Sequence, residues 1–321
     1  MSKIVLVGAA AAATASFCHY ARNSKRAVTA DIANVPFVSY SVQPKTLRLL
    51  APLDDGYPSG ELGVHFDVHT GETLVVTPES LKPNHVLVKL LAVSADPYQR
   101  GRIKSKNPLT GGSSTTEQQA AEPRAMSGFV AGKILASRHP KWKPGDLFGA
   151  ALPITTVMVI DLSSNAFVWP LRGITEEQVS LGVGVLGMPG STAYGGLIGC
   201  LRPKRGETLY VSGAAGAVGS LVGELGKSLF DLKVIGSCGG PDKCARIVES
   251  HGFDVAIDRK KLPKWGSDGD WTASKEALRQ QLQEAAGPGG IDMYFDNVGA
   301  DHFEAAFESL GKGGRVAICG K

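Results

Sequence analysis

A glycine-spaced turn between a short apolar strand and a helix constrains the fold of this chain most. The turn runs through Val211-Ser212-Gly213-Ala214-Ala215-Gly216-Ala217-Val218-Gly219, after the strand Thr208–Val211. Apolar residues then recur on one helical face, at Val218, Leu221, Val222, Leu225 and Leu229. Glycines let a backbone approach the phosphates of a dinucleotide, and a helix N-terminus offers unpaired N–H groups to their charge. We therefore expect Gly216, Ala217, Val218 and Gly219 to hold a pyrophosphate; the alternative is an ordinary tight turn of an α/β protein.

The end of the next strand, 232–236, indicates which dinucleotide would bind. An NAD site usually places an acidic residue there, as a partner for the ribose 2′-hydroxyl. Here the small residues 237–240 follow instead, and then Lys243, with Arg259 after the third strand. A 2′-phosphate would meet two cations, so we expect NADP. The alternative is that Lys243 and Arg259 are solvated surface charges. Asp242 beside the lysine reduces the local positive charge and weakens the argument for NADP.

Strands and helices alternate from residue 207 onward, which is typical of a doubly wound parallel sheet. We expect strands at 208–212, 232–236, 254–257, 292–296 and 315–319, and helices at 217–229, 242–250, 275–286 and 301–310. This α/β region, 181–321, is interpreted as the dinucleotide (Rossmann) domain. A six-stranded fold of this kind would continue past residue 319. We therefore expect an incomplete sheet with an open edge at its last strand, low stability and little turnover.

Residues 45–180 have a different pattern, with short β-rich segments separated by Gly, Pro and Asp. Five strands are expected, at 63–68, 73–76, 85–93, 128–136 and 154–160. This pattern predicts a small β-barrel-like domain. A loop rich in Gly, Ser, Thr and Gln interrupts it from Lys104 to Arg124, and composition does not decide whether that loop covers an active site.

Composition bounds the class of protein. The chain has 321 residues, of which 43% are hydrophobic and 20% charged, which is ordinary for two globular domains. Its net charge of +4 comes from residues 1–30, where Lys3, Arg22, Lys25 and Arg26 occur without an acid. The remainder is neutral, so nucleic acid is not an expected partner. No apolar run is long enough to span a membrane, and a membrane is not an expected partner.

Residues 1–44 are interpreted as an N-terminal extension. Its apolar run after Lys3 resembles a secretory signal, and its Ala, Ser and Arg content resembles an organellar transit peptide. A disordered or wrongly assigned extension remains an equal alternative. We expect a cytoplasmic protein, or an organellar one if the extension is a transit peptide. The five cysteines, at positions 18, 200, 238, 244 and 319, lack paired spacing, which favours a reducing compartment.

Metal and hydrolase signals are weak. His65 and His69 are four residues apart, but they alternate with apolar residues and fit the polar face of a strand. We therefore expect no zinc. No Gly-x-Ser-x-Gly or His-Glu-x-x-His pattern supports a hydrolase. Asn297 ends the fourth strand, where it could contact a cofactor or close an Asx-turn. Tyr98 lies in a polar cluster, either as a functional group or packed as core.

Several motifs in one order carry a family resemblance over roughly residues 45–321. They are Asp96-Pro97-Tyr98-x-Arg100-Gly101-Arg102, Met188-Pro189-Gly190-x-Thr192-Ala193-Tyr194, Ala214-Ala215-Gly216-Ala217-Val218-Gly219-Ser220, Lys243, Tyr294-Phe295-Asp296-Asn297-Val298-Gly299 and Ile318-Cys319-Gly320. Together they resemble the zinc-independent medium-chain reductases known as alkenal, prostaglandin and curcumin reductases. The resemblance implies a GroES-like barrel followed by a Rossmann domain, a homodimer, and NADPH-dependent reduction of the C=C bond of α,β-unsaturated aldehydes and ketones.

The resemblance also implies roles for residues of this chain. Gly216 to Gly219 would hold the pyrophosphate and Lys243 the 2′-phosphate, while Asn297 and Cys319 would lie along the nicotinamide half. Arg259 stands where the family commonly has a tyrosine, so that contact would become more electrostatic. For catalysis only Tyr98 is a candidate, as the group that stabilises an enolate. The alternatives to an enone reductase are a quinone reductase of the same superfamily and a catalytically silent NADPH-binding protein.

Overall fold

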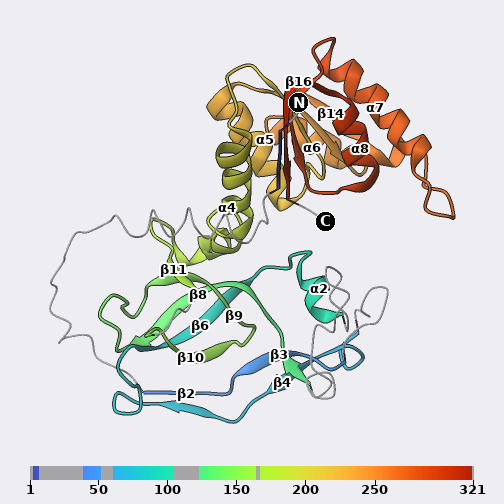
Figure 1. The fold of residues 1–321 in the computed structure, drawn as a ribbon. Helices are drawn as coiled ribbons and strands as arrows, with labels where there is room; N and C mark the ends of the chain where they lie inside the picture. The colour runs from blue at the N-terminus through green and yellow to red at the C-terminus, as the bar shows by residue number, and fades with distance from the viewer. Residues whose placement is uncertain (1–2, 7–38, 52–60, 105–122, 164–166, 320–321) are drawn as a thin grey trace. The chain divides into compact units, whose positions relative to one another are not determined.

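The computed structural model describes residues 3–6, 39–51, 61–104, 123–163 and 167–319, and these form two compact units (Figure 1). One unit combines strand β1 (Lys3–Leu6) with the residues from Met188 onward, and the other lies within Ala27–Gly187. The division therefore falls after Gly187, seven residues beyond the expected boundary. Most of the expected N-terminal extension and of the 104–124 loop lies outside the described residues.

The unit from Met188 onward is built on a parallel sheet with strand order β1-β16-β15-β12-β13-β14. All neighbouring strands pair in parallel. The five strands expected from the sequence are β12 (Thr208–Val211), β13 (Lys233–Cys238), β14 (Val255–Asp258), β15 (Ile291–Asp296) and β16 (Leu310–Ile318). The predicted doubly wound α/β architecture is thereby confirmed.

Helices cover both faces of this sheet, because alternate strand residues point to opposite sides. Leu209 and Val211 join one buried cluster, whereas Tyr210 between them joins the other. On the first face pack α4 (Met188–Tyr194), the π-helix η3 (Gly195–Leu201), α5 (Ala217–Phe230) and α6 (Pro241–Ser250). On the second pack α7 (Thr272–Ala286) and α8 (Ala300–Glu308), and Figure 1 shows α5 and α7 on opposite sides.

Helix α5 packs through its small residues. Of the five apolar positions on the expected helical face, only Val222 is fully buried. Leu229 is 52% exposed, so the prediction that the buried face extends to Leu229 was wrong. The other buried positions are Gly219, Gly223 and Gly226. A Cβ at Gly223 would collide with the ring of Phe253. Glycines therefore bring α5 close to the sheet, which positions its N-terminus beside the end of β12.

The outer edge of β16 is occupied, and our expectation of an open edge there was wrong. Strand β1 pairs with β16 in parallel, with Lys3 opposite Arg315 and Leu6 opposite Ile318. The apolar, β-branched run Ile4-Val5 has the propensity of a buried strand. A parallel edge offers unpaired backbone groups that such a strand can satisfy. The sequence indicates the strand, but its partner comes from the far end of the chain.

The other unit is β-rich, as predicted. Its largest sheet is antiparallel, in the order β10-β6-β8-β9-β11. Those strands are β10 (Val157–Asp161), β6 (His85–Val93), β8 (Ser127–Ser137), β9 (Leu147–Pro153) and β11 (Val168–Pro170). Smaller sheets contain β2 (Tyr40–Val42) with β5 (Leu74–Val76), and β3 (Lys45–Leu49) between β4 (Phe66–Thr70) and β7 (Arg124–Ala125). The expected strand at 63–68 is thus shifted toward Thr70.

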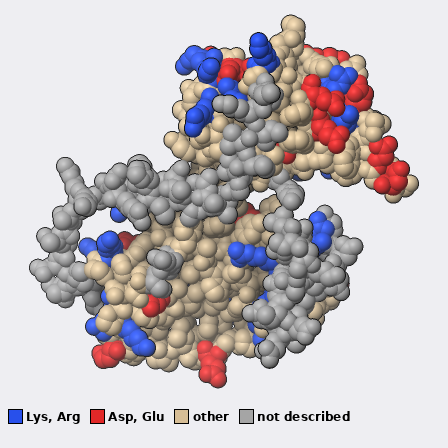
Figure 2. Space-filling view, viewed as in Figure 1, with Lys and Arg blue, Asp and Glu red and all other residues tan. Residues whose placement is uncertain are grey.

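The exposed sides of α7 and α8 carry paired charges. Figure 2 shows acidic side chains gathered over these helices with basic ones among them. Lys275 Nζ lies 3.0 Å from Glu308 Oε1, and the Arg279 guanidinium pairs with Glu276. A surface of mixed charge is typical of a solvated helix pair. In the described ranges, no helix combines the length and apolar character needed to cross a bilayer.

Candidate functional site

The strand order of the parallel sheet reverses at β12, and this reversal defines a candidate site. The chain runs outward from β12 through β13 to β14 and then returns to β15 on the other side of β12. Ligands of doubly wound sheets bind at the carboxyl ends of the strands at such a point. Ser212 follows β12 and Asn297 follows β15. Asn297 Nδ2 donates to Ser212 O at 2.8 Å, which ties the two strand ends together.

The glycine turn after β12 ends in a helix N-terminus that no side chain caps. Helix α5 begins at Ala217, and its N-cap residue is Gly216. Gly213 has a φ of +61°, a backbone conformation that favours glycine, and its carbonyl accepts from Gly216 N at 3.0 Å. A Cβ at Gly213 would lie 3.3 Å from Asn297 Cβ. Turn, helix end and Asn297 therefore converge, and the uncapped N–H groups fit an anion such as a pyrophosphate.

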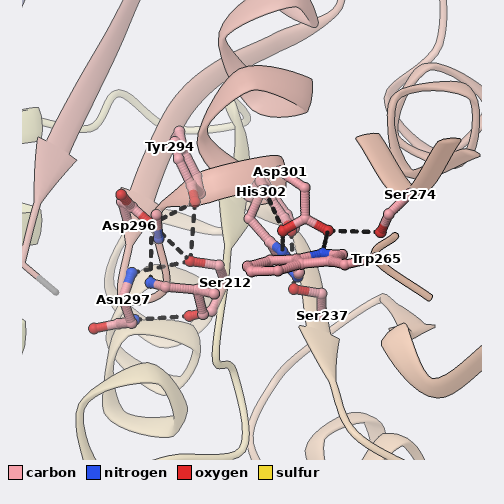
Figure 3. A network of polar contacts seen from close by, with 12 residues as sticks. Ser212, Ser237, Trp265, Ser274, Tyr294, Asp296, Asn297, Asp301 and His302 are labelled. Carbon is pink, nitrogen blue, oxygen red and sulfur yellow. Dashed lines mark hydrogen bonds and ion pairs between the residues drawn. The ribbon is translucent and has the colours of Figure 1, made fainter. Parts of the chain in front are cut away.

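A buried carboxylate holds the loop that carries Asn297 (Figure 3). Asp296 is 1% exposed, and its Oδ1 accepts hydrogen bonds from Tyr294 Oη at 2.6 Å and Ser212 Oγ at 3.1 Å. The same oxygen accepts from the backbone N–H groups of Val298 and Gly299. Burial raises the pKa of Tyr294 well above its ordinary value, so this phenol stays a hydrogen-bond donor. The turn after β15 is thus closed by Asp296, which leaves the Asn297 side chain at the strand end.

A second buried carboxylate lies nearby in Figure 3, and its contacts are structural. Asp301 is 3% exposed and accepts from Ser274 Oγ at 2.6 Å and Trp265 Nε1 at 3.2 Å. His302 Nδ1 lies 3.0 Å from the other carboxylate oxygen. Burial alone would raise the pKa of Asp301, but these hydrogen bonds outweigh it and hold the pKa below its usual range. The network fixes the start of α8 against α7.

The loop after β13 carries the candidate 2′-phosphate site. Gly240 has a φ of +98°, and its N–H donates to Asp258 Oδ1 at 2.7 Å. This contact draws the residues after β14 toward the loop. A Cβ at Gly239 would lie 3.7 Å from Lys260 Cε and 3.9 Å from Arg259 Nε. Lys243 is exposed in the first turn of α6, so cations from two elements flank a loop that contains no carboxylate at residues 237–240.

Two basic residues were missed in the sequence, one at the loop after β13 and one at the glycine turn after β12. Lys260 directly follows Arg259 and lies closer to the glycine loop. Arg246 donates from its guanidinium to Ala215 O at 3.1 Å, inside the glycine turn. The helical spacing between Lys243 and Arg246 was a usable signal, because positions i and i+3 share a helix face. Ser212 was also missed, since a serine inside a glycine turn has no sequence signature for bracing another strand.

The remaining cofactor-binding candidate, Cys319, contacts Asp296, the residue before Asn297. Its N–H donates to Asp296 O at 2.8 Å, just past the end of β16. Burial raises the pKa of this thiol to about 11, so it is not a nucleophile at neutral pH. All eight residues proposed for cofactor binding therefore lie in one unit, at the carboxyl edge of its sheet.

Tyr98 belongs to the β-rich unit, just before helix α2 (Gln99–Ile103). Its ring packs edge-on against Phe129, with centroids 5.9 Å apart, and the Arg102 guanidinium carbon lies 5.0 Å from the ring centroid. Tyr98 Oη is buried, without a hydrogen-bond partner in the described structure. A cavity of about 420 Å³ opens beside it and is lined by Asp96, Gln99 and Met126 among others, but not by Tyr98. These contacts favour packing as the role of the ring.

Within the residues that the structure describes, no group of three or more His, Cys, Asp or Glu side chains is placed to hold a metal ion. The absence of zinc therefore stays a prediction, which metal analysis of the protein can test.

Comparison with known proteins agrees with this arrangement of a β-rich unit and a dinucleotide fold. Residues 68–168 match a family described as the N-terminal domain of oxidoreductase, and residues 217–321 match a family described as zinc-binding dehydrogenase. Prostaglandin reductase 1 of Bos taurus is 34% identical over 83% of this chain and 69% of its own length. The chain belongs to the medium-chain dehydrogenase/reductase family, in the zinc-independent group that includes these reductases.

Other relatives point to the same group. The NADPH-dependent curcumin reductase of Escherichia coli is 34% identical over 73% of this chain, and the 2-alkenal reductase (NADP(+)-dependent) of Nicotiana tabacum is 35% identical over 74% of it. The chain spans 60% and 62% of the lengths of these two relatives. The crystal structure of CurA from Vibrio vulnificus in complex with NADPH is 30% identical, with a TM-score of 0.65 over 86% of this chain and 71% of that one.

Proposed function

We propose that this chain is an NADPH-dependent reductase of the C=C bond of α,β-unsaturated aldehydes and ketones. The observation that carries the proposal is the glycine loop after β13, which Lys243, Arg259 and Lys260 flank where an NAD site would have an acid. A 2′-phosphate would gain charge-assisted hydrogen bonds there. The relatives named curcumin reductase and alkenal reductase, whose names specify NADPH and NADP(+), support the same cofactor.

The residues of the switch point would bind and orient the cofactor. The N–H groups at Gly216 to Gly219 would hold the pyrophosphate on the N-terminus of α5. One N–H of the Asn297 side-chain amide donates to Ser212 O, so its second N–H and its oxygen are the groups it can offer to a ligand. Asp296 braces that loop through four hydrogen bonds, which keeps the Asn297 side chain in a fixed position. Cys319 would form part of the wall next to it.

When bound, NADPH supplies a hydride for the β-carbon of the enone. Charge then builds on the carbonyl oxygen, and a proton must reach the α-carbon, so the protein must stabilise an enolate. Tyr98 is the candidate that the sequence offers for this task. Its packing against Phe129 favours a structural role instead, and a substitution described below separates the two.

The test is product analysis with purified protein, NADPH and the enone 3-nonen-2-one. We expect NADPH oxidation and formation of the saturated ketone, identified by mass spectrometry. Turnover of menadione without reduction of the enone would replace the proposal by a quinone reductase. Saturable NADPH binding with no turnover of either compound would make the chain a binding protein and would overturn the enzymatic proposal.

We further propose a homodimer that acts on small molecules in the cytoplasm, with an organelle as the alternative location if the N-terminal segment carries a transit signal. The dimer and the cytoplasmic location rest on the family resemblance. Sedimentation of the full chain would test the dimer. Fractionation of cells that express the full chain would test the location.

A further inference from the structure

We propose that Cys238 and Cys244 form a reversible disulfide that controls the cofactor loop after β13. Their Sγ atoms lie 3.3 Å apart, in direct contact. Sequence spacing had suggested scattered, unpaired cysteines. In the fold they are neighbours, because the five residues between them form a turn that brings the start of α6 back to the end of β13.

Both cysteines are held by regular structure. Cys238 is the last residue of β13, and Cys244 lies in the first turns of α6. The turn between them is set by Gly240, whose left-handed backbone conformation starts the helix and whose carbonyl accepts from Cys244 N at 3.1 Å. A disulfide has an Sγ–Sγ distance of about 2.05 Å, so the two sulfurs must approach by only about 1.2 Å. A small shift of the first turn of α6 would suffice.

The two thiols differ in access to solvent. Cys238 is 4% exposed, and its burial, together with its contact with Cys244, raises its pKa to about 12. Cys244 is only partly buried. An external oxidant therefore meets Cys244 first, and Cys238 acts afterwards as the resolving thiol within the protein.

The oxidant considered is a low-molecular-weight disulfide such as glutathione disulfide. The deprotonated Cys244 sulfur attacks it, forms a mixed disulfide and releases one glutathione thiolate. Cys238 then loses its proton, attacks Cys244 Sγ and releases the second glutathione. In sum, two protein thiols and one glutathione disulfide give one protein disulfide and two glutathione thiols. Excess reduced glutathione reverses both steps.

The bond would act on the cation cluster around the loop. Lys243 directly precedes Cys244, and Gly239 and Gly240 lie between the two cysteines against Lys260. Drawing α6 toward β13 would displace Lys243 relative to Arg259 and Lys260. This effect on NADPH rests on the proposed function, whereas formation of the disulfide does not. Linkage is reciprocal. Bound NADP⁺ must therefore lower the equilibrium constant of disulfide formation by the same factor by which the disulfide lowers the affinity for NADP⁺.

Formation of the disulfide is tested first, on the folded full-length chain without cofactor. The protein is equilibrated at pH 8 with a series of reduced and oxidised glutathione ratios, quenched with acid, alkylated and mapped by peptide mass spectrometry. We expect the peptides that contain Cys238 and Cys244 to become linked, two hydrogens lighter, and to be released again by reduced glutathione. If both residues remain alkylated separately in excess glutathione disulfide, or link to other cysteines, the proposal fails.

Two serine variants serve as controls. Cys244→Ser should abolish the internal bond and leave the shielded Cys238 slow to react. Cys200→Ser removes a partly buried cysteine of η3, an element other than β13 and α6, and should leave the 238–244 bond unchanged. Because Cys238→Ser alters a buried site and could unfold the unit, the Cys244→Ser variant carries the test.

The coupling is tested by NADP⁺ titration of the reduced and oxidised protein, followed by intrinsic fluorescence. We expect oxidation to lower the affinity for NADP⁺ about five- to tenfold, within the range usual for coupled sites. In Cys244→Ser, oxidation should leave that affinity unchanged. Saturating NADP⁺ should shift the glutathione ratio at half-oxidation by the same factor. Equal affinities of the two forms would overturn the control of the loop. If the reduced protein does not bind NADP⁺ at all, the proposed function fails while the mapped disulfide still stands.

Discussion

A Cβ at Gly219 would lie 2.5 Å from Gly213 O, closer than any real Cβ approaches a carbonyl oxygen. The two glycines thus set the distance between the first turn of α5 and the turn before it. We expect Gly219→Ala to push α5 away from the turn, because the obstructing atom is backbone and cannot rotate aside. Overpacking of this kind costs about 1–3 kcal/mol of unfolding free energy. Thermal melting should show the loss, and NADPH binding should weaken with it.

The matched control for that prediction is Gly199→Ala. A Cβ at Gly199 meets no atom within 4 Å, so the change should be neutral or slightly stabilising. A Gly219→Ala protein that melts and binds NADPH like the Gly199→Ala protein would refute the role assigned to this contact.

Lys243→Ala tests the choice of cofactor. Loss of one charge-assisted contact of about 1.5–3 kcal/mol should lower the affinity for NADPH about ten- to 150-fold and leave the affinity for NADH nearly unchanged. Fluorescence titration with both cofactors measures the ratio. Lys312→Ala, an exposed lysine near the amino end of β16, should change neither affinity. Equal losses for NADPH and NADH would remove Lys243 from the 2′-phosphate site.

Metal analysis tests the zinc-independent chemistry. We expect the purified protein to contain no stoichiometric zinc and a chelator to leave its activity intact, because the sequence offers no clustered Cys and His ligands. Elemental analysis that finds one zinc per chain would contradict this.

Asp301→Asn tests the buried network between α7 and α8. The pKa of Asp301 is lower in the folded protein than in the unfolded chain, so its stabilisation is complete above about pH 4 and is lost as the pH falls further. The variant should lose about 1.5–3 kcal/mol at pH 7, the range for hydrogen bonds to a charged group. Urea unfolding at pH 7 and pH 3 should show the difference from wild type shrinking in acid. The exposed control Asp268→Asn should unfold like wild type at both values. A constant difference would exclude the charge as its cause.

Tyr98→Phe separates packing from catalysis. The ring contacts with Phe129 and Arg102 remain, and the lost hydroxyl has no partner in the described structure, so we expect unchanged or slightly higher stability. We also expect kcat within about threefold of wild type, against the loss of about 100-fold that follows removal of an oxyanion donor. A fall of that size in kcat, at unchanged NADPH affinity, would establish Tyr98 as the enolate-stabilising residue.

The sequence predicted the parts of the fold that depend on local pattern. The strand, glycine turn and helix around Gly216 are local, and so is the alternation that leads to β15 and Asn297. Strand β9 was missed because Gly149, Ala150 and Ala151 are poor strand formers. Gly149 is required there because a Cβ would collide with the Trp169 ring from β11, a contact that local pattern does not reveal.

The candidate site divides in the same way. Residues that act through backbone geometry or helix position, such as Gly219 and Lys243, were found from spacing. Those that act across the sheet were not, since Ser212 braces Asn297 from another strand and Lys260 reaches Gly239 through the fold. The contact between Cys238 and Cys244 escaped notice because their spacing matches no known pairing motif, and only the left-handed turn at Gly240 closes the distance.

The pairing of β1 with β16 makes the dinucleotide unit discontinuous in sequence, because Lys3 opposite Arg315 joins segments with the whole β-rich unit between them. Closing so long a loop has a high entropic cost before any contact repays it, so this pair should be among the last to form during folding. During synthesis β1 leaves the ribosome long before its partner exists. The growing chain must therefore keep an apolar strand unpaired until β16 emerges, a period in which a chaperone would have most effect on the yield of folded protein.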